Sequence, residues 1–193
     1  MELCQLCFVS QSFAIFDDME TLQYPIGKFQ APAQINQEHL TAWIETLDQL
    51  PARLRALTKD LSDQQLDTPY RPEGWTVRQV VHHLADSHHN SYIRFKWALT
   101  EDNPIIKAYD EKAWTMLPDL EASPIEWSLR HLEVIHHKLV QLLKVMTEEQ
   151  YNRNFTHPDG NKVVTLKENL GHYAWHSSHH YAHIENLMKR SNW

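Results

Sequence analysis

Hydrophobic residues recur at helical spacing in four long segments of this chain of 193 residues. The first segment begins near Asn36 and continues through Leu40, Trp43, Ile44 and Leu47. Apolar residues three or four positions apart predict an amphipathic helix. Pro51 falls inside the same pattern. It predicts either a kink or the start of a new helix, because proline lacks the amide hydrogen used in a helix interior.

Three further amphipathic segments begin at recognisable residues. Thr76 is a suitable N-cap for the second, whose apolar positions begin at Val77. Ser123 and Pro124 predict the start of the third, with serine as the cap and proline in the first turn. The last segment is predicted to run from about Thr165 to residue 190.

Connections of unequal length join these segments. Residues 62–75 are predicted to form a loop with one helical turn, and residues 101–122 form a long connection. Residues 152–162 are rich in turn formers, with Asp159–Gly160 as the strongest turn signal. We expect the 70–75 loop and the 101–122 connection to form the walls of any pocket.

Four long helices predict an all-α protein with the architecture of a four-helix bundle. Glycine is scarce, with only 4 residues, and alternation typical of strands is hard to find. Residues 24–193 are predicted to form a single domain. Residues 1–23 are interpreted as an N-terminal extension, either flexible or belonging to a start assigned too far upstream.

The charge of the chain excludes some classes of partner. A formal net charge of −7 and a pI near 6.0 argue against nucleic acid and against an anionic membrane surface. No stretch reaches the roughly 20 apolar residues of a membrane-spanning helix. Cys4 and Cys7 form a lone C-x-x-C pair without the further ligands of a structural zinc site. With no disulfide framework, we expect a cytoplasmic location.

The last helix contains five histidines in twelve positions: His172, His176, His179, His180 and His183. At about 100° per residue, His180 falls within the apolar arc of the helix and His176 at its border. His179 and His183 are predicted to point further toward solvent. His176 and His180 are spaced i, i+4, so both rings could bind one ion.

A third ligand could come from the second helix, which contains His82, His83, His88 and His89. Periodicity leaves both His83 and His88 open as inward residues, whereas His82 and His89 point away. A lone inward histidine is usually a hydrogen-bonded core residue. Several imidazoles facing one apolar space favour a metal site, because they would otherwise lack partners. Asp86 is a candidate outer partner for a ligand.

Four stretches of the chain resemble the DinB/YfiT-like superfamily. They are "YPIG" at 24–27, "LDTPYRPEGWTVRQVVHHLADSHHNSYIRFK" at 66–96, "YDEKAW" at 109–114 and "YAWHSSHHYAHI" at 173–184. The resemblance covers about residues 24–193. It implies a four-helix bundle and a divalent metal held by His83, His176 and His180, which resolves the choice between His83 and His88. It also implies homodimers, and activity as a metal-dependent hydrolase or a thiol S-transferase of the bacillithiol type.

Three neutral imidazoles suit one Zn²⁺ or Ni²⁺ per chain and leave coordination positions open for a reactant. The expected function is therefore a metal-dependent enzyme that activates water or a low-molecular-weight thiol toward a small-molecule substrate. Asp86, His136 and Tyr173 are candidate catalytic helpers. The alternatives are a metal sensor or store that binds extra ions through its surplus histidines, and a structural bundle without metal. His131 and His137 could also approach the site.

Overall fold

The structure of this protein is a computed structural model, and it describes residues 19–193. Cys4 and Cys7 lie outside the described residues, so the interpretation of this pair stays a prediction. The division of the chain at residue 23 also stays a prediction. A short helical segment at residues 19–23 precedes the elements named next. These are α2 (Gln37–Thr58), α3 (Asp63–Leu66), α4 (Val77–Thr100), α5 (Glu111–Trp114), α6 (Pro118–Ala122), α7 (Ile125–Val145), α8 (Glu148–Asn152), β1 (Asn154–His157), η1 (Asp159–Asn161), β2 (Lys162–Thr165) and α9 (Leu166–Ser191).

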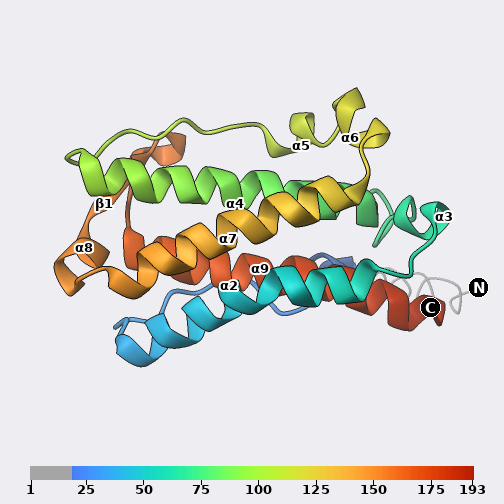
Figure 1. The fold of residues 1–193 in the computed structure, drawn as a ribbon, viewed down its shortest axis with the longest axis horizontal. Helices are drawn as coiled ribbons and strands as arrows, with labels where there is room; N and C mark the ends of the chain where they lie inside the picture. The colour runs from blue at the N-terminus through green and yellow to red at the C-terminus, as the bar shows by residue number, and fades with distance from the viewer. Residues whose placement is uncertain (1–18) are drawn as a thin grey trace, which may run out of the picture.

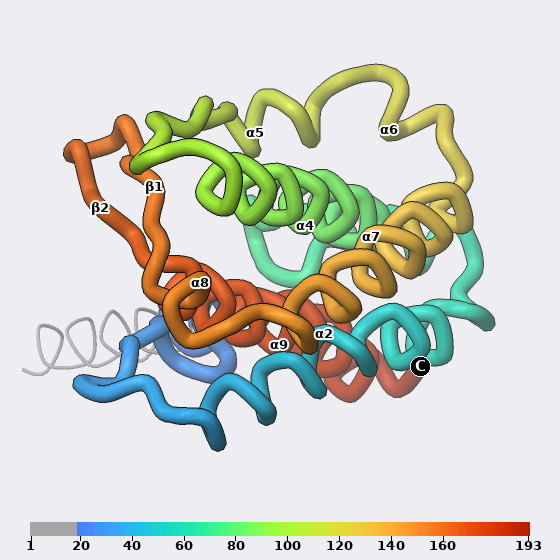
Figure 2. Tube along the Cα trace, turned by 60° about the vertical axis from the view of Figure 1, so that its left-hand side comes forward, coloured from blue at the N-terminus to red at the C-terminus, as the bar shows by residue number. Residues whose placement is uncertain are grey.

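The four long helices pack in the cyclic order α2, α7, α4, α9, as Figure 1 and the turned view in Figure 2 show. Contacts join α4 to α7, α7 to α2, α2 to α9 and α9 to α4. The prediction of an all-α four-helix bundle is confirmed. The consecutive long helices α2 and α4 lie across the bundle from each other, so the connection between them crosses one end.

Local capping explains where α4 and α9 begin. The Thr76 side chain accepts the backbone N–H of Gln79, and the Gln79 side chain accepts the N–H of Thr76. Thr165 and Glu168 form the same reciprocal arrangement at α9. Both satisfy amides that have no partner inside the helix. These two predicted starts are confirmed.

The predicted cap of α7 is displaced by one residue. Ser123 is the residue after the short helix α6, and Pro124 takes the N-cap position of α7 without a side-chain hydrogen bond. Because α6 ends at Ala122, the serine closes that helix in an extended conformation. The prediction of Ser123 as the α7 cap was therefore wrong.

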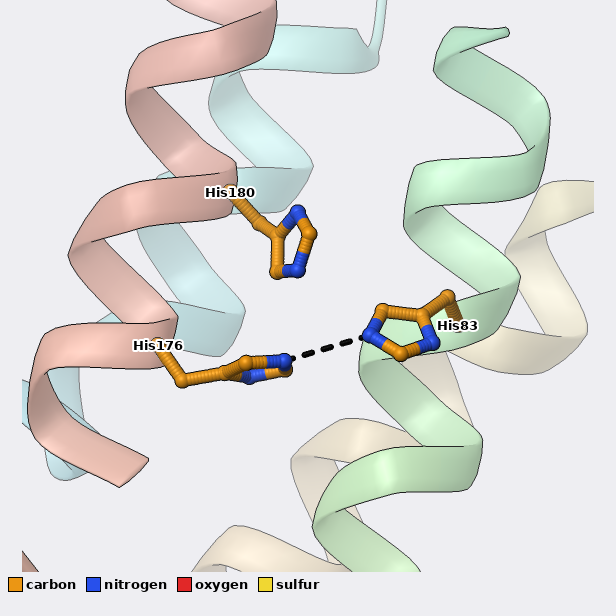
Figure 3. Close-up of side chains that lie close together, drawn as sticks. All are labelled: His83, His176 and His180. Atoms are coloured by element: carbon orange, nitrogen blue, oxygen red, sulfur yellow. Dashed lines mark hydrogen bonds between the residues drawn. The ribbon is translucent and has the colours of Figure 1, made fainter. Parts of the chain in front are cut away.

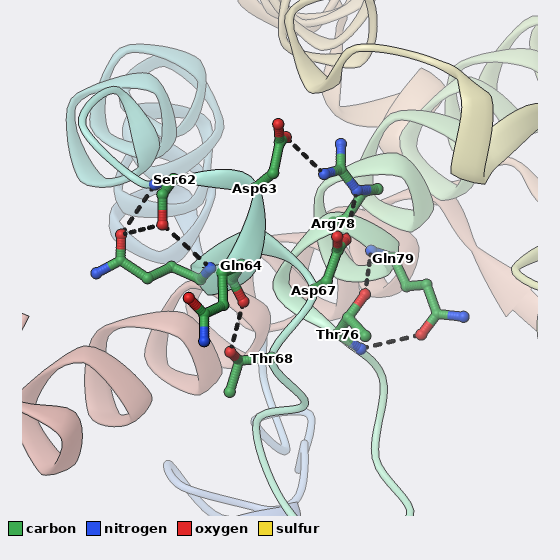
Figure 4. Close-up of polar contacts among 9 residues, drawn as sticks. Ser62, Asp63, Gln64, Asp67, Thr68, Thr76, Arg78 and Gln79 are labelled. Carbon is green, nitrogen blue, oxygen red and sulfur yellow. Dashed lines mark hydrogen bonds and ion pairs between the residues drawn. The ribbon is translucent and has the colours of Figure 1, made fainter.

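Two ion pairs bind α3 to the first turn of α4. The Arg78 guanidinium lies 2.9 Å from a carboxylate oxygen of Asp63 and 2.7 Å from one of Asp67 (Figure 4). The same figure shows the capping contacts of Ser62 and Thr76 at the starts of the two helices. The start of α4, six residues before His83, is thus held from outside the bundle.

Helix α2 continues through Pro51, so the start of a new helix there is excluded. The other alternative, a kink at the proline within one helix, stays a prediction. Pro51 is itself buried in the bundle, beside Leu50 and Leu54. Its neighbours therefore keep the helix packed although one helical hydrogen bond is missing.

The hydrophobic core has two parts, one toward each end of the bundle. One cluster contains Phe95 of α4 and Leu170 of α9, and the other contains Leu84 of α4 and Ile184 of α9. The histidines of α4 and α9 come mostly between these positions along both helices. A layer of buried imidazoles therefore separates the two apolar clusters.

The 152–162 connection contains a β-hairpin that the sequence did not predict. Strands β1 and β2 pair antiparallel, with Phe155 opposite Val164, and the chain turns at Asp159–Gly160 as expected. Gly160 has a φ of 72°, which glycine adopts without the steric cost of a side chain. Each strand has four residues. That length is too short for an alternating pattern to be distinct from chance.

Among residues 19–193, no helix is both long and apolar enough to span a membrane.

Candidate metal centre

His83 of α4 and His176 and His180 of α9 converge in the middle of the bundle (Figure 3). One nitrogen from each ring lies within 4.8 Å of the other two, and all three residues are buried. The Nε2 atoms of His83 and His176 are 3.1 Å apart. Figure 3 shows one ring nitrogen of His180 directed toward this pair and the other directed away. The structure thus brings together the three residues that the family resemblance implies as ligands.

Burial keeps these imidazoles neutral. It lowers the pKa of His83 to about 4, with a smaller contribution from His179. It also lowers the pKa of His176 and of His180 well below the usual value, and neighbouring histidines add to the effect. Desolvation disfavours the charged ring, and each ring disfavours a charge on the next. The neutral rings retain the lone pairs that a metal requires.

A second group of three histidines adjoins the first and shares His180. One nitrogen each from His179, His180 and His183 lies within 4.8 Å of the others. The solvent-exposed positions predicted for His179 and His183 were wrong, because only 7% and 2% of their surfaces are exposed. Trp175 stacks on His179 at 4.5 Å between ring centroids, and Tyr70 stacks on His183 at 3.9 Å.

The other histidines of α4 and α7 lie in four places. His82, predicted to point away, is 4% exposed, and its Nδ1 lies 2.7 Å from Ser128 Oγ. That prediction was wrong because α7 covers this face of α4. His89 pairs with His131 at 2.9 Å, away from the centre. His88 and His136 are buried behind His176. His137 is exposed.

Two cavities border the centre, of about 620 and 460 Å³. His172 and His176 line both of them. The first is walled by residues of the 70–75 loop and by residues 111–116 of the 101–122 connection, so the expected pocket walls are confirmed. A reactant can therefore approach the three histidines from outside the bundle.

The second cavity contains residues that sequence reasoning missed. Arg94 and Tyr109 line it together with Tyr173, one of the expected helpers. The Tyr173 hydroxyl oxygen lies 3.4 Å from Ser87 Oγ and 3.4 Å from an Arg94 nitrogen. Arg94 follows His83 by eleven residues, which is three helical turns and the same face of α4. This spacing was the feature of the sequence that could have identified Arg94 as a residue near the centre.

Arg94 carries a charge without a carboxylate partner within the described part of the chain. Its one side-chain hydrogen bond there goes to the hydroxyl oxygen of Tyr173. The guanidinium is half-buried at the cavity wall. A cation in this setting can bind a polar or anionic group of a small molecule.

The other two candidate helpers have different surroundings. His136 reaches the centre only through His88, whose Nδ1 lies 2.9 Å from His136 Nε2. Asp86 is not among the residues that line the two cavities. Burial raises the pKa of Asp86 to about 6, and the carboxylate of Asp119 adds to this rise. Among residues 19–193, no hydrogen bond or ion pair joins the Asp86 carboxyl to the three histidines.

Comparison with known proteins adds independent information. The family model described as the DinB superfamily matches residues 46–184. A protein of Bacillus subtilis (strain 168), YfiT, described only provisionally as a metal-dependent hydrolase, is 49% identical over 172 residues, which are 89% of this chain and 97% of the relative. A relative from Bacillus cereus (strain AH820), described in the same way, is 50% identical over 175 residues, covering 91% of this chain and 100% of the relative.

A solved structure of YfiT from Bacillus subtilis has the same fold. It is described as a probable metal-dependent hydrolase with an unusual four-helix bundle topology. The TM-score is 0.87 at 49% sequence identity, and the match covers 90% of this chain and 99% of the other. With a family match over most of its length and relatives of this similarity, the chain belongs to the DinB superfamily.

Proposed function

We propose that this protein is a divalent-metal-dependent enzyme whose metal ligands are His83, His176 and His180. The observation that carries the proposal is the convergence of three buried, neutral imidazoles beside two cavities. An all-nitrogen donor set suits Zn²⁺ or Ni²⁺, and three protein ligands leave room for a reactant. The names of the relatives support metal dependence.

When bound, the ion would lower the pKa of a coordinated water or thiol, so that a nucleophile is available near neutral pH. The chain's own residues supply the remaining functions. The Tyr173 hydroxyl faces the second cavity, where it can donate a hydrogen bond to the substrate. Arg94 holds the oxygen of Tyr173 and offers its positive charge to a polar group of the substrate.

Both expected activities, hydrolase and thiol S-transferase, are consistent with this arrangement. In hydrolysis, the oxygen of water bonds to the acyl carbon and the leaving group departs with a proton. In thiol transfer, the thiol gives up its proton and its sulfur bonds to an electrophilic carbon. The bond from that carbon to the leaving group breaks, and the leaving group departs with the electron pair and takes up the proton. The three ligands serve either reaction, so substrate trials must decide between them.

Metal content tests the ligand set directly. Protein purified without chelators is expected to contain about one Zn²⁺ or Ni²⁺ per chain by elemental analysis. His83→Ala, His176→Ala and His180→Ala should each lose the ion. His137→Ala is the matched control, because His137 is exposed on α7. Wild-type protein without metal, or ligand variants with full metal content, would refute the proposal.

Activity of the metal-loaded protein then separates the two reactions. One series of assays offers ester and amide substrates, and the other offers low-molecular-weight thiols together with an electrophile. We expect turnover in one series, with loss of turnover in His180→Ala. If the loaded protein is inactive in both, the enzymatic part of the proposal fails although the metal site stands.

The second histidine group favours an alternative function, a metal store or sensor. His179, His180 and His183 are close enough to hold an ion of their own. A store should bind more than one ion per chain, and His179→Ala should reduce that number. A stoichiometry of about one ion per chain that is unchanged in His179→Ala would exclude this alternative.

We also propose that the protein is a homodimer located in the cytoplasm. Sedimentation equilibrium tests the first proposal and cell fractionation tests the second.

A further inference from the structure

Pro51 leaves one main-chain carbonyl of α2 without its usual partner. In an α-helix, the carbonyl of residue 47 would accept the N–H of residue 51, and proline has none. The Nδ1 atom of His136, on the neighbouring helix α7, lies 2.5 Å from the oxygen of Leu47. The buried His136 ring therefore occupies the position that the missing amide leaves open.

This contact fixes the proton positions of a chain of three imidazoles. A carbonyl oxygen only accepts, so His136 must carry a proton on Nδ1. The neutral ring then accepts at Nε2, which lies 2.9 Å from Nδ1 of His88. His88 in turn donates from Nδ1 and accepts at Nε2, 3.2 Å from Nδ1 of His176.

At the end of this chain, His176 has its proton on Nδ1 and a free lone pair on Nε2. That Nε2 is the atom that lies 3.1 Å from Nε2 of His83. The opposite direction of donation would require His136 to donate from both nitrogens at once. It would then carry a charge, although the ring is only 1% exposed.

A separate chain fixes His180 in the same manner. The Nε2 atom of His183 lies 3.0 Å from the main-chain oxygen of Gln23, so it must donate its proton there. Nδ1 of His183 is then an acceptor, and it lies 3.3 Å from Nδ1 of His180. His180 therefore has its proton on Nδ1 and a free lone pair on Nε2.

We propose that His88, His136 and His183 are positioning residues that hold His176 and His180 in the one neutral form able to bind a metal through Nε2. Each chain of imidazoles ends on a carbonyl oxygen, of Leu47 or of Gln23. Neither carbonyl can take up a proton at accessible pH, so the chains orient the ligands and do not conduct protons. Pro51 belongs to this arrangement because it frees the first carbonyl.

The proposal assigns the contact between His180 and His183 to a hydrogen bond instead of a second metal site. The role in metal binding rests on the proposed function. The proton positions do not, because they can be measured without metal. Two-bond ¹H–¹⁵N correlation spectra of the metal-free protein at pH 7.5 report which imidazole nitrogen carries the proton. We expect protons on Nδ1 of His88, His136, His176 and His180, and on Nε2 of His183.

Variants test each chain separately. His136→Phe keeps a ring in the core but removes both nitrogens, and we expect His176 to become a mixture of the two neutral forms while His180 stays unchanged. His183→Phe should have the reciprocal effect. His137→Phe, on the exposed face of the same helix, is the control for His136→Phe. Metal affinity should fall about 10- to 100-fold in the two chain variants and stay constant in the control.

The wild-type spectrum alone can overturn the proposal, even if a variant fails to fold. A proton on Nε2 of His176 or His180 in the metal-free protein would do so. Unchanged ligand spectra in a folded His136→Phe protein would also refute it. If the spectra agree but the protein binds no metal, the proposed function fails while the assignment of the protons stands.

Discussion

Tyr70 stacks on His183, with ring centroids 3.9 Å apart and ring planes inclined by 15°. Tyr70 belongs to the loop between α3 and α4, and His183 belongs to α9. The loop is fixed at this point, since the carbonyl of Tyr70 accepts a hydrogen bond of 2.7 Å from Arg190. A residue far away in the sequence thus covers the face of α9 on which His183 lies.

This stack predicts a large effect of removing the ring. Tyr70→Ala should lower the free energy of unfolding by about 3–5 kcal/mol, as is typical when a buried aromatic side chain is truncated. Tyr70→Phe keeps the ring and should cost less than about 1.5 kcal/mol. Urea denaturation followed by circular dichroism measures both changes. Similar losses in the two variants would show that the hydroxyl, and not the stack, matters.

The buried histidines predict strong sensitivity of the metal-free protein to acid. Burial lowers the pKa of four of them to about 3 or 4: His83, His136, His179 and His183. The unfolded chain has histidines with a pKa near 6.5, so it binds more protons than the folded chain between about pH 6.5 and 4. Stability should therefore fall with pH in this window and be fully present above it.

The steepness of this acid transition is measurable. If three of the rings take up protons together on unfolding, the free energy of unfolding changes by about 4 kcal/mol per pH unit. Urea titrations at several pH values between 7.5 and 4.5 give this slope. A metal-free protein whose stability is the same at pH 7.5 and 5 would contradict the burial of neutral histidines.

Metal should stabilise the folded protein by binding to the three proposed ligands, His83, His176 and His180. At a free ion concentration of 100 times the Kd, the free energy of unfolding should rise by about 2.7 kcal/mol. The rise should disappear in His180→Ala and persist in His137→Ala. A similar rise in both variants would place the ion elsewhere, because His137 is exposed on α7.

Tyr173 should affect turnover more than metal binding. Its oxygen accepts from Ser87 and contacts Arg94, so its own hydrogen is free to point into the cavity. Tyr173→Phe should lower kcat about 100-fold with metal content unchanged, as when a donor to a developing charge is removed. Tyr181→Phe is the control, since Tyr181 packs against Arg53 on α2. Equal kcat values in the two variants would remove Tyr173 from the reaction.

Periodicity was sufficient to predict the bundle. The apolar stripes of the long helices are regular, and the threonines at positions 76 and 165 define where α4 and α9 begin. The hairpin at 154–165 was missed because its short strands are stabilised by pairing with each other and by contact with the rest of the chain. An isolated bridge between Ile105 and Thr156 is one such contact.

The candidate centre was predictable in part. The i, i+4 pair of His176 and His180 followed from the helix geometry alone, but His83 and His88 were equal candidates on that ground. The resemblance favoured His83, and the structure places His88 behind His176 instead, where it contacts Nδ1. A helical wheel gives the direction of a side chain but not what lies beyond it. It therefore could not show that the 70–75 loop covers His183.

The two sides of the centre come from distant parts of the chain, since His83 and His176 are separated by 93 positions. Any ion that joins them acts as a cross-link, comparable in topology to a disulfide between the same residues. Closing a loop of this length removes several kcal/mol of entropy from the unfolded chain, about 4–5 kcal/mol in the loop-closure model. A metal that stayed bound during unfolding would thus keep the second and last long helices tethered and speed their return to the native pairing.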